Sequence, residues 1–269
     1  MEIIRDIDYG GNYGKQSTLD IYMRKNDKGN GCLIIFTHGG LYKDGDKNQY
    51  EHLAKFLLEN EKLKKIENVA VAIINYPLSS EQNGIKYPKH NKECASSLFW
   101  LYNNLESKYG FKIDNIILIG HSCGGTINGL LLYDDSIGVP KEVLSKIKGS
   151  FSVSSIFDLQ SLTKELPKQF LEDFYISHPK EQIENWACPI NKVNKRSNCE
   201  WFIYHSKKDP WVELSQAQNF ANKLKENDIE FNLVTPEDGG EHYDEIRDKF
   251  DQHTHFQSLL VEFILSKAK

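Results

Sequence analysis

The chain has few of the residues that mark disulfide scaffolds and zinc modules. Its cysteines are odd in number, widely spaced and without any Cys-x-x-Cys pair; they are Cys32, Cys94, Cys123, Cys188 and Cys199. A disulfide framework or a zinc site needs paired or clustered ligands at characteristic spacings. We therefore expect neither a disulfide framework nor a metal site, and we expect no cofactor. Free thiols fit a reducing, cytoplasmic location.

Long apolar runs and clustered positive charge are also absent. No run approaches the roughly 18 apolar residues of a membrane span, and the opening MEIIRDIDYGGNYG lacks the basic and then apolar order of a secretory signal. The 33 Lys and Arg residues are scattered and are outnumbered by 38 Asp and Glu, for a net charge of −5. Such a chain is poorly suited to a row of phosphates. We expect a small-molecule substrate, with no nucleic-acid or membrane partner, and keep a homodimer as one option for assembly.

What is present is a regular alternation of short apolar runs with longer amphipathic segments. This pattern is typical of an α/β protein with a mostly parallel sheet and helices on both faces, and no domain boundary interrupts it over residues 1–269. Buried strands are predicted at residues 32–37, 69–75, 116–119, 149–153, 201–205 and 231–234, and helices at 49–59, 89–109, 126–133, 214–226 and 254–267. Residues 17–23 alternate apolar and polar, which predicts a half-exposed antiparallel strand at the starting edge of the sheet.

Residues 158–200 interrupt this rhythm. They combine a predicted helix over residues 162–175 with the loop-like stretch SHPKEQIENWACPINKVNKRSN. A segment of this kind between two strands predicts an insertion over one end of the sheet, which is where a cap or lid would lie.

The stretch GHSCGG at residues 120–125 carries the first catalytic signal. It follows an apolar strand and precedes a helical pattern, which is the setting of a nucleophile held in a strained strand-to-helix turn. Gly120 and Gly124 fit this turn because the backbone and the following helix leave no room there for a Cβ. The phosphate-binding patterns GxxxxGK[ST] and GxGxxG are both missing. We interpret Ser122 as a nucleophile.

A serine hydroxyl needs a base within hydrogen-bonding reach and an acid that orients the base. In the strand-turn-serine setting, the acid follows a later strand and the histidine comes later still. Asp209 lies just beyond the predicted strand 201–205, and His242 lies beyond the strand 231–234. Glu213 is the rival acid, but Asp209 is nearer the strand end and is followed by a proline that pins the loop.

The developing oxyanion needs backbone donors from the residue after the serine and from the loop after an earlier strand. The strand 32–37 runs into His-Gly-Gly, where the glycines let backbone N–H groups approach a substrate. We assign this role to the N–H groups of Gly40, Leu41 and Cys123, with Gly39 as a further candidate.

Together the segments HGG, GHSCGG, KKDP and GEHYDEI resemble the α/β-hydrolase fold, in the branch of HGG-type esterases that includes kynurenine formamidases. The resemblance spans nearly the whole chain. It implies a serine hydrolase that cleaves an aryl formamide, N-formyl-L-kynurenine, to kynurenine and formate through an acyl-enzyme. The chain departs from the family's HGGxW pattern, because Leu41, Tyr42 and Lys43 follow the glycines.

Two other functions remain open at this point. A carboxylesterase for small acyl or aryl esters would use the same machinery, and a receptor on a hydrolase fold would normally have lost one of the three catalytic residues. The candidate pocket walls are aromatic residues, although each such residue is more often core or loop packing than a substrate contact: Tyr42, Tyr76, Phe157, Trp186 and Trp211.

Overall fold

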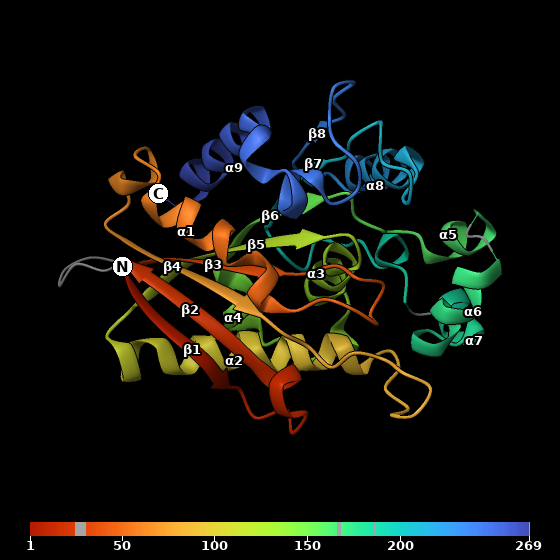
Figure 1. Ribbon diagram of the computed structural model, residues 1–269, viewed down its shortest axis with the longest axis horizontal. Coiled ribbons are helices and arrows are strands. Elements are labelled where there is room, and N and C mark those ends of the chain that lie inside the picture. Colours follow the sequence, from red (N-terminus) through yellow and green to blue (C-terminus); the bar gives the residue numbers. More distant parts are fainter. Residues whose placement is uncertain (25–30, 166–167, 186, 269) are drawn as a thin grey trace.

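The computed structural model describes residues 1–24, 31–165, 168–185 and 187–268. In this part of the chain an eight-stranded sheet has the order β1-β2-β4-β3-β5-β6-β7-β8 (Figure 1). The strands are β1 (Glu2–Asp8), β2 (Thr18–Arg24), β3 (Gly31–Thr37), β4 (Asn68–Ile74), β5 (Ile113–His121), β6 (Ile147–Val153), β7 (Glu200–Tyr204) and β8 (Phe231–Val234). Strands β3 to β8 run parallel, whereas β2 is antiparallel to both β1 and β4. The predicted α/β fold and the six predicted strands are therefore confirmed, but β8 lies at the edge of the sheet and is only partly buried, whereas a buried strand was expected.

The antiparallel edge differs from expectation. The predicted strand over residues 17–23 exists as β2, but it is buried along most of its length and lies between β1 and β4. The starting edge is β1, which the sequence did not reveal because EIIRDID lacks regular alternation and is mostly exposed. A register shift between Ile4 and Ile7 interrupts the β1–β2 ladder, and such a bulge disturbs the period-two pattern on which strand prediction depends.

Helices cover both faces of the sheet. One face carries α1 (Glu51–Glu59) and α9 (Thr254–Lys267), and the other carries α2 (Lys89–Tyr109), α3 (Cys123–Tyr133), α4 (Lys141–Lys146) and α8 (Leu214–Glu226). Successive residues of a strand point to opposite faces of the sheet. On β3, Leu33 packs in the core under α2, α3, α4 and α8, and Ile34 packs in the core under α1 and α9. The helices predicted at 89–109, 214–226 and 254–267 are confirmed in type and extent.

The described part of the segment between β6 and β7 contains three α-helices that lie beyond one end of the sheet (Figure 1). After them the chain returns along α3, where Asn194 donates to the Tyr133 carbonyl at 3.0 Å. The three helices are α5 (Leu159–Glu165), α6 (Lys168–Ser177) and α7 (Lys180–Asn185). The single helix predicted over 162–175 thus falls on two helices, with residues 166–167 outside the described part. The end of α6 is tied to the main domain because the Tyr87 N–H donates to the Ser177 carbonyl at 2.8 Å.

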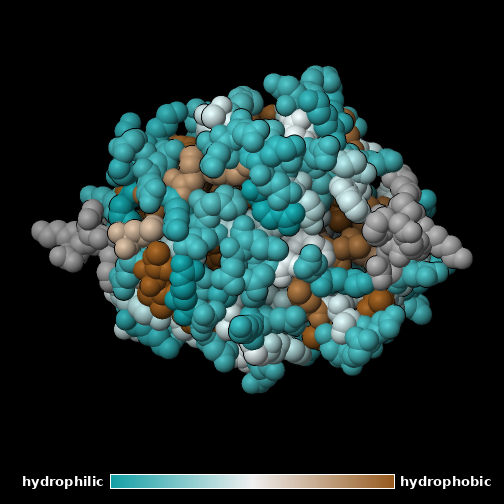
Figure 2. Space-filling model, in the orientation of Figure 1, coloured by the Kyte–Doolittle hydropathy of each residue, from teal (hydrophilic) through white to brown (hydrophobic). Residues whose placement is uncertain are grey.

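The visible surface in Figure 2 is mostly hydrophilic, with hydrophobic residues in small patches. Among the described residues, no helix combines the length and apolarity needed to cross a membrane. Trp211 is an exception to the polar surface, because 53% of it is exposed. Single exposed apolar side chains are common on protein surfaces, so exposure by itself assigns Trp211 no role.

Candidate active site

Ser122 occupies a strained turn between β5 and α3. Its φ is 52° and its ψ is −124°, a conformation that costs a non-glycine residue roughly 1–3 kcal/mol. The turn is held because the Ser122 N–H donates to the Val153 carbonyl at 2.9 Å. A Cβ on Gly124 would lie 2.1 Å from the carbonyl oxygen of Thr37, so only glycine fits there. The strain therefore presents the serine at the start of α3, as the GHSCGG pattern predicts.

His242 and Asp209 are brought together from the loops after β8 and β7. The His242 Nδ1 lies 2.7 Å from Asp209 Oδ2, and the aspartate side chain is 1% exposed. Asp209 Oδ1 accepts the backbone N–H groups of Trp211 at 2.8 Å and Val212 at 3.0 Å. Burial alone would raise the pKa of the Asp209 carboxyl, but the hydrogen bond and charge of His242 and the two N–H donors hold the pKa below its ordinary value. The carboxyl is thus ionised at neutral pH.

Glu213, the rival acid, lies elsewhere. It is exposed and immediately precedes α8, where its carboxylate accepts the Ser215 hydroxyl at 3.5 Å. In the described part of the chain, Asp209 is the carboxylate that contacts the His242 ring.

Two further histidines form hydrogen bonds with the loops that carry His242 and Asp209. His121 Nε2 lies 2.8 Å from the His242 carbonyl, and His205 Nε2 lies 2.8 Å from the Val212 carbonyl. Burial lowers the pKa of both side chains, that of His121 well below its ordinary value. Each ring is therefore neutral and donates its Nε2–H to the loop. The sequence does not reveal the contact of His121, because it joins residues 121 positions apart in the chain.

The glycine loop after β3 lies directly against the nucleophile. A Cβ on Gly39 would lie 2.8 Å from the Ser122 Cβ. Burial raises the pKa of the Cys123 thiol, and this effect is opposed by the Tyr76 hydroxyl and by the backbone N–H groups of Tyr42 and Leu41. The loop and the first turn of α3 are thus in contact, which is the juxtaposition that a two-sided oxyanion site needs.

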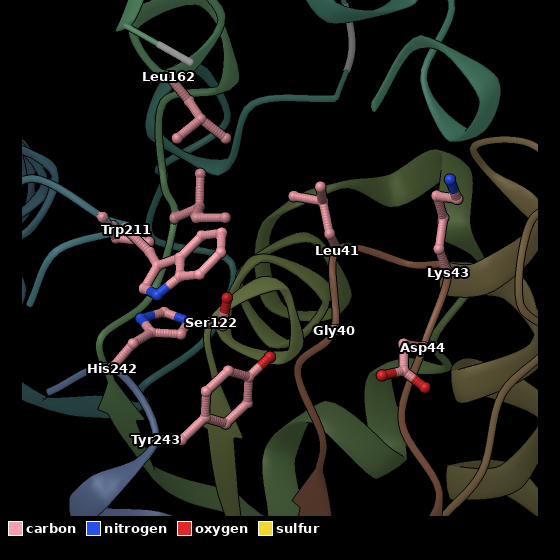
Figure 3. Close-up of a pocket in the computed structure, with 11 residues that line it drawn as sticks. Gly40, Leu41, Lys43, Asp44, Ser122, Leu162, Trp211, His242 and Tyr243 are labelled. Carbon is pink, nitrogen blue, oxygen red and sulfur yellow. The ribbon is translucent and has the colours of Figure 1, made fainter. Parts of the chain in front are cut away.

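A cavity of about 310 Å³ opens beside Ser122 (Figure 3). This volume is at the small end of the roughly 300–1,000 Å³ typical of small-molecule sites. Its lining is mostly apolar or aromatic, with one cation and one anion other than the catalytic candidates: Gly40, Leu41, Lys43, Asp44, Ser122, Ile156, Leu162, Trp211, Val212, His242 and Tyr243. Ser122 and His242 therefore face the same space.

Most of the predicted pocket walls are wrong. Tyr42, Tyr76 and Phe157 are at most 1% exposed and belong to the core. The Tyr42 ring packs 4.3 Å from a histidine that follows α6, the Tyr76 hydroxyl donates to a carbonyl of the glycine loop at 3.0 Å, and Phe157 stacks at 3.8 Å on a phenylalanine of α8. Trp211 does line the cavity, and Trp186 lies outside the described residues.

The cavity also contains residues that sequence reasoning did not assign to it. Ile156 and Leu162 come from the start of the 158–200 region and its flank, and Tyr243 directly follows His242. The position of Tyr243 beside the base was the available signal. Within the described ranges, no three His, Cys, Asp or Glu side chains are grouped as metal ligands would be.

The fold and site define an α/β hydrolase, and comparison with known proteins agrees. Esterase B from Lactobacillus rhamnosis superposes with a TM-score of 0.80 at 16% identity, covering 99% of this chain and 86% of that one, which shows a shared fold. The BD-FAE family model matches residues 19–224. The chain belongs to the BD-FAE family and is a hydrolase.

Sequence relatives bear out the resemblance to formamidases. A kynurenine formamidase of Meyerozyma guilliermondii is 25% identical over 230 residues, or 81% of each chain. A probable carboxylic ester hydrolase, LipM, of Mycobacterium tuberculosis is also 25% identical, over 82% of this chain and 51% of its own length. These relatives support hydrolysis, but they differ in the substrate class that their names give.

Proposed function

We propose that the chain is a serine hydrolase in which Ser122 is the nucleophile, His242 the general base and Asp209 the acid that orients it. His242 Nε2 removes the hydroxyl proton as Ser122 Oγ attacks the substrate carbonyl carbon. The N–H groups of Gly40, Leu41 and Cys123, with that of Gly39 as a further donor, stabilise the oxyanion. His242 then gives the proton to the leaving group, and a water molecule hydrolyses the acyl-enzyme by the same steps.

The hydrogen bond of 2.7 Å between His242 Nδ1 and Asp209 carries this proposal. An ionised carboxylate can only accept, so Nδ1 carries a proton and the neutral ring keeps its lone pair on Nε2. This is the tautomer that a general base for Ser122 needs. The strained turn and the shared cavity supply the nucleophile at the same place.

For the substrate we propose an aryl formamide, N-formyl-L-kynurenine, which yields kynurenine and formate in tryptophan degradation. The formyl group would pass to Ser122, and the aryl amine would leave with the proton from His242. The relatives named kynurenine formamidase support this choice, as does the small cavity. Trp211 and Tyr243 offer aromatic surfaces beside the base, where the aryl leaving group must lie.

A carboxylesterase is the second candidate. The apolar cavity lining of Leu41, Ile156 and Leu162 favours it, since these side chains could hold a short acyl chain. The relative named as a carboxylic ester hydrolase and the esterase structures point the same way. Both reactions pass through a tetrahedral oxyanion, so only the cavity distinguishes them.

One set of measurements separates these functions. Steady-state kcat/KM should be compared for N-formyl-L-kynurenine and for the formyl, acetyl and butyryl esters of one phenol. A formamidase cleaves the formamide and prefers formyl esters, whereas a carboxylesterase accepts longer acyl groups and leaves the formamide intact. A fluorophosphonate probe should label the protein but not Ser122→Ala, which should lose about three or more decades in kcat. Absence of labelling of the unmodified protein would favour an inactive receptor.

A further inference from the structure

The cavity has a charged wall that the hydrolytic machinery does not use. Lys43 and Asp44 are adjacent in the chain, line the cavity and bear opposite charges. Their backbone N–H groups both donate to the Gly40 carbonyl, at 3.0 Å and 2.9 Å. The two residues are therefore held in a tight turn that continues directly from the proposed oxyanion donors.

The remaining lining makes this wall distinctive. Figure 3 shows Lys43 and Asp44 on the side of the cavity across from Trp211 and His242. Among the described lining residues, Lys43 is the one lysine or arginine. Arg247 lies nearby, but its guanidinium stacks 3.9 Å from the centre of the Tyr243 ring and donates to its sequence neighbour Asp248.

Figure 3 shows the charged ends of Lys43 and Asp44 pointing to different sides, so the wall offers one cation and one anion that are not paired with each other. Such a wall is complementary to a head group that carries both charges, because the flexible four-carbon stem of a lysine lets its ammonium turn toward a bound ligand. A lysine ammonium donates to a carboxylate, and an aspartate carboxylate accepts from an ammonium. An α-amino acid head group presents these two ions on one carbon atom. A neutral aryl substrate, in contrast, gains nothing from either side chain, and a substrate with a single charge is matched by one and opposed by the other.

We propose that Lys43 and Asp44 select substrates whose leaving group carries a zwitterionic α-amino acid. This inference rests on the proposed formamidase function and names the part of its substrate that the wall recognises. The aryl ring lies along Trp211 and Tyr243, next to the base, and the amino acid reaches the opposite wall. Lys43 binds the carboxylate and Asp44 binds the ammonium.

The test crosses substrate charge with side-chain charge. The substrates are N-formyl-L-kynurenine, its decarboxylated analogue, its des-amino analogue and ortho-formamidoacetophenone, which lacks the whole head group. The variants are Lys43→Gln and Asp44→Asn. Matched controls are Lys148→Gln and Asp114→Asn. Lys148 lies on β6 and Asp114 on β5, each at the N-terminal end of its strand and therefore at the edge of the sheet opposite the cavity. Thermal unfolding verifies that each variant is folded.

In the unmodified enzyme, removal of either head-group charge should lower kcat/KM about tenfold, mainly through KM. Lys43→Gln should abolish the advantage of the carboxylate and preserve that of the ammonium, and Asp44→Asn should do the reverse. The controls should leave every ratio unchanged. Added salt should reduce the preference of the unmodified enzyme, because it screens exposed charges.

The outcomes distinguish this inference from the proposed function. Equal rates on all the formamides, or variants that slow every substrate alike, would overturn the role of Lys43 and Asp44 and leave the formamidase intact. Failure to cleave any formamide would overturn the formamidase. The charge test then uses O-acetyl-L-tyrosine, its decarboxylated and des-amino analogues, and para-ethylphenyl acetate. If Lys43→Gln again abolishes the advantage of the carboxylate and Asp44→Asn that of the ammonium, the proposed role of these two residues is supported. If neither variant changes the preference, that role is refuted.

Discussion

Substitution of Asp209 by asparagine tests the proposed mechanism most directly, because each oxygen of the carboxylate has a defined partner. Oδ1 accepts the N–H groups of Trp211 and Val212 at 2.8 Å and 3.0 Å, and Oδ2 accepts from His242 Nδ1 at 2.7 Å. Asparagine keeps one acceptor oxygen and replaces the other with an NH₂ group. The oxygen should face the two backbone donors, since the opposite orientation would set NH₂ against two N–H groups.

In that orientation the amide NH₂ faces His242 Nδ1. The ring nitrogen must then accept a hydrogen bond, so the proton moves to Nε2 and His242 can no longer act as a base for Ser122. The charge that stabilises the imidazolium is lost as well. From triads of this geometry we expect kcat to fall by about 10⁴, which corresponds to about 5.4 kcal/mol of transition-state free energy.

The assay is single-turnover acylation of Ser122 by an aryl formate ester, with thermal unfolding to establish that the variant is folded. Nitrogen NMR of His242 gives an independent readout, because the ring proton should move from Nδ1 to Nε2. Glu213→Gln is the matched control, since Glu213 is exposed and its loss should change kcat by less than about twofold. An Asp209→Asn enzyme within tenfold of normal, with Glu213→Gln much slower, would transfer the acid role to Glu213.

Further predictions concern the cavity, the His242 loop and acid stability. Leu41→Ala should raise kcat/KM for butyryl esters roughly ten- to two-hundredfold for each methylene of space gained; an unchanged acyl preference would show that Leu41 does not limit the cavity. His121→Phe removes the donor to the His242 carbonyl and should reduce stability by about 1–3 kcal/mol and lower kcat, as measured by urea unfolding and steady-state rates; normal values for both would exclude the contact. Burial lowers the pKa of His38 to about 4 and that of His90 to about 3, from 6.5. The unfolded chain binds the extra protons, so the free energy of unfolding should fall by about 2 kcal/mol per histidine between about pH 7 and 5; a flat urea-unfolding profile over this range would contradict it.

Local patterns in the sequence were sufficient for much of the fold. The helix at residues 89–109 ends where predicted because Gly110, with φ 66°, closes it in a left-handed cap. The strand before GHSCGG and the helix after it were predicted by short-range periodicity, and together they define the turn that strains Ser122. The order serine, aspartate, histidine after three parallel strands predicted that the three residues meet at one edge of the sheet, because parallel strands deliver their following loops to one edge. The 2.7 Å contact joins the aspartate and the histidine, and the serine lines the same cavity as the histidine.

The sequence alone did not determine which aromatic side chains enter the core. Tyr42 and Trp211 both lie in loops that follow strand ends, yet the first is fully buried and the second is 53% exposed and lines the cavity. A tyrosine or tryptophan has enough apolar surface for either place. Whether such a side chain is buried depends on packing against elements distant in the sequence. For Tyr42 one such neighbour is His178, which follows α6 and packs against the tyrosine ring. Only the tertiary structure decides it, because burial is a property of neighbours that come from elsewhere in the chain.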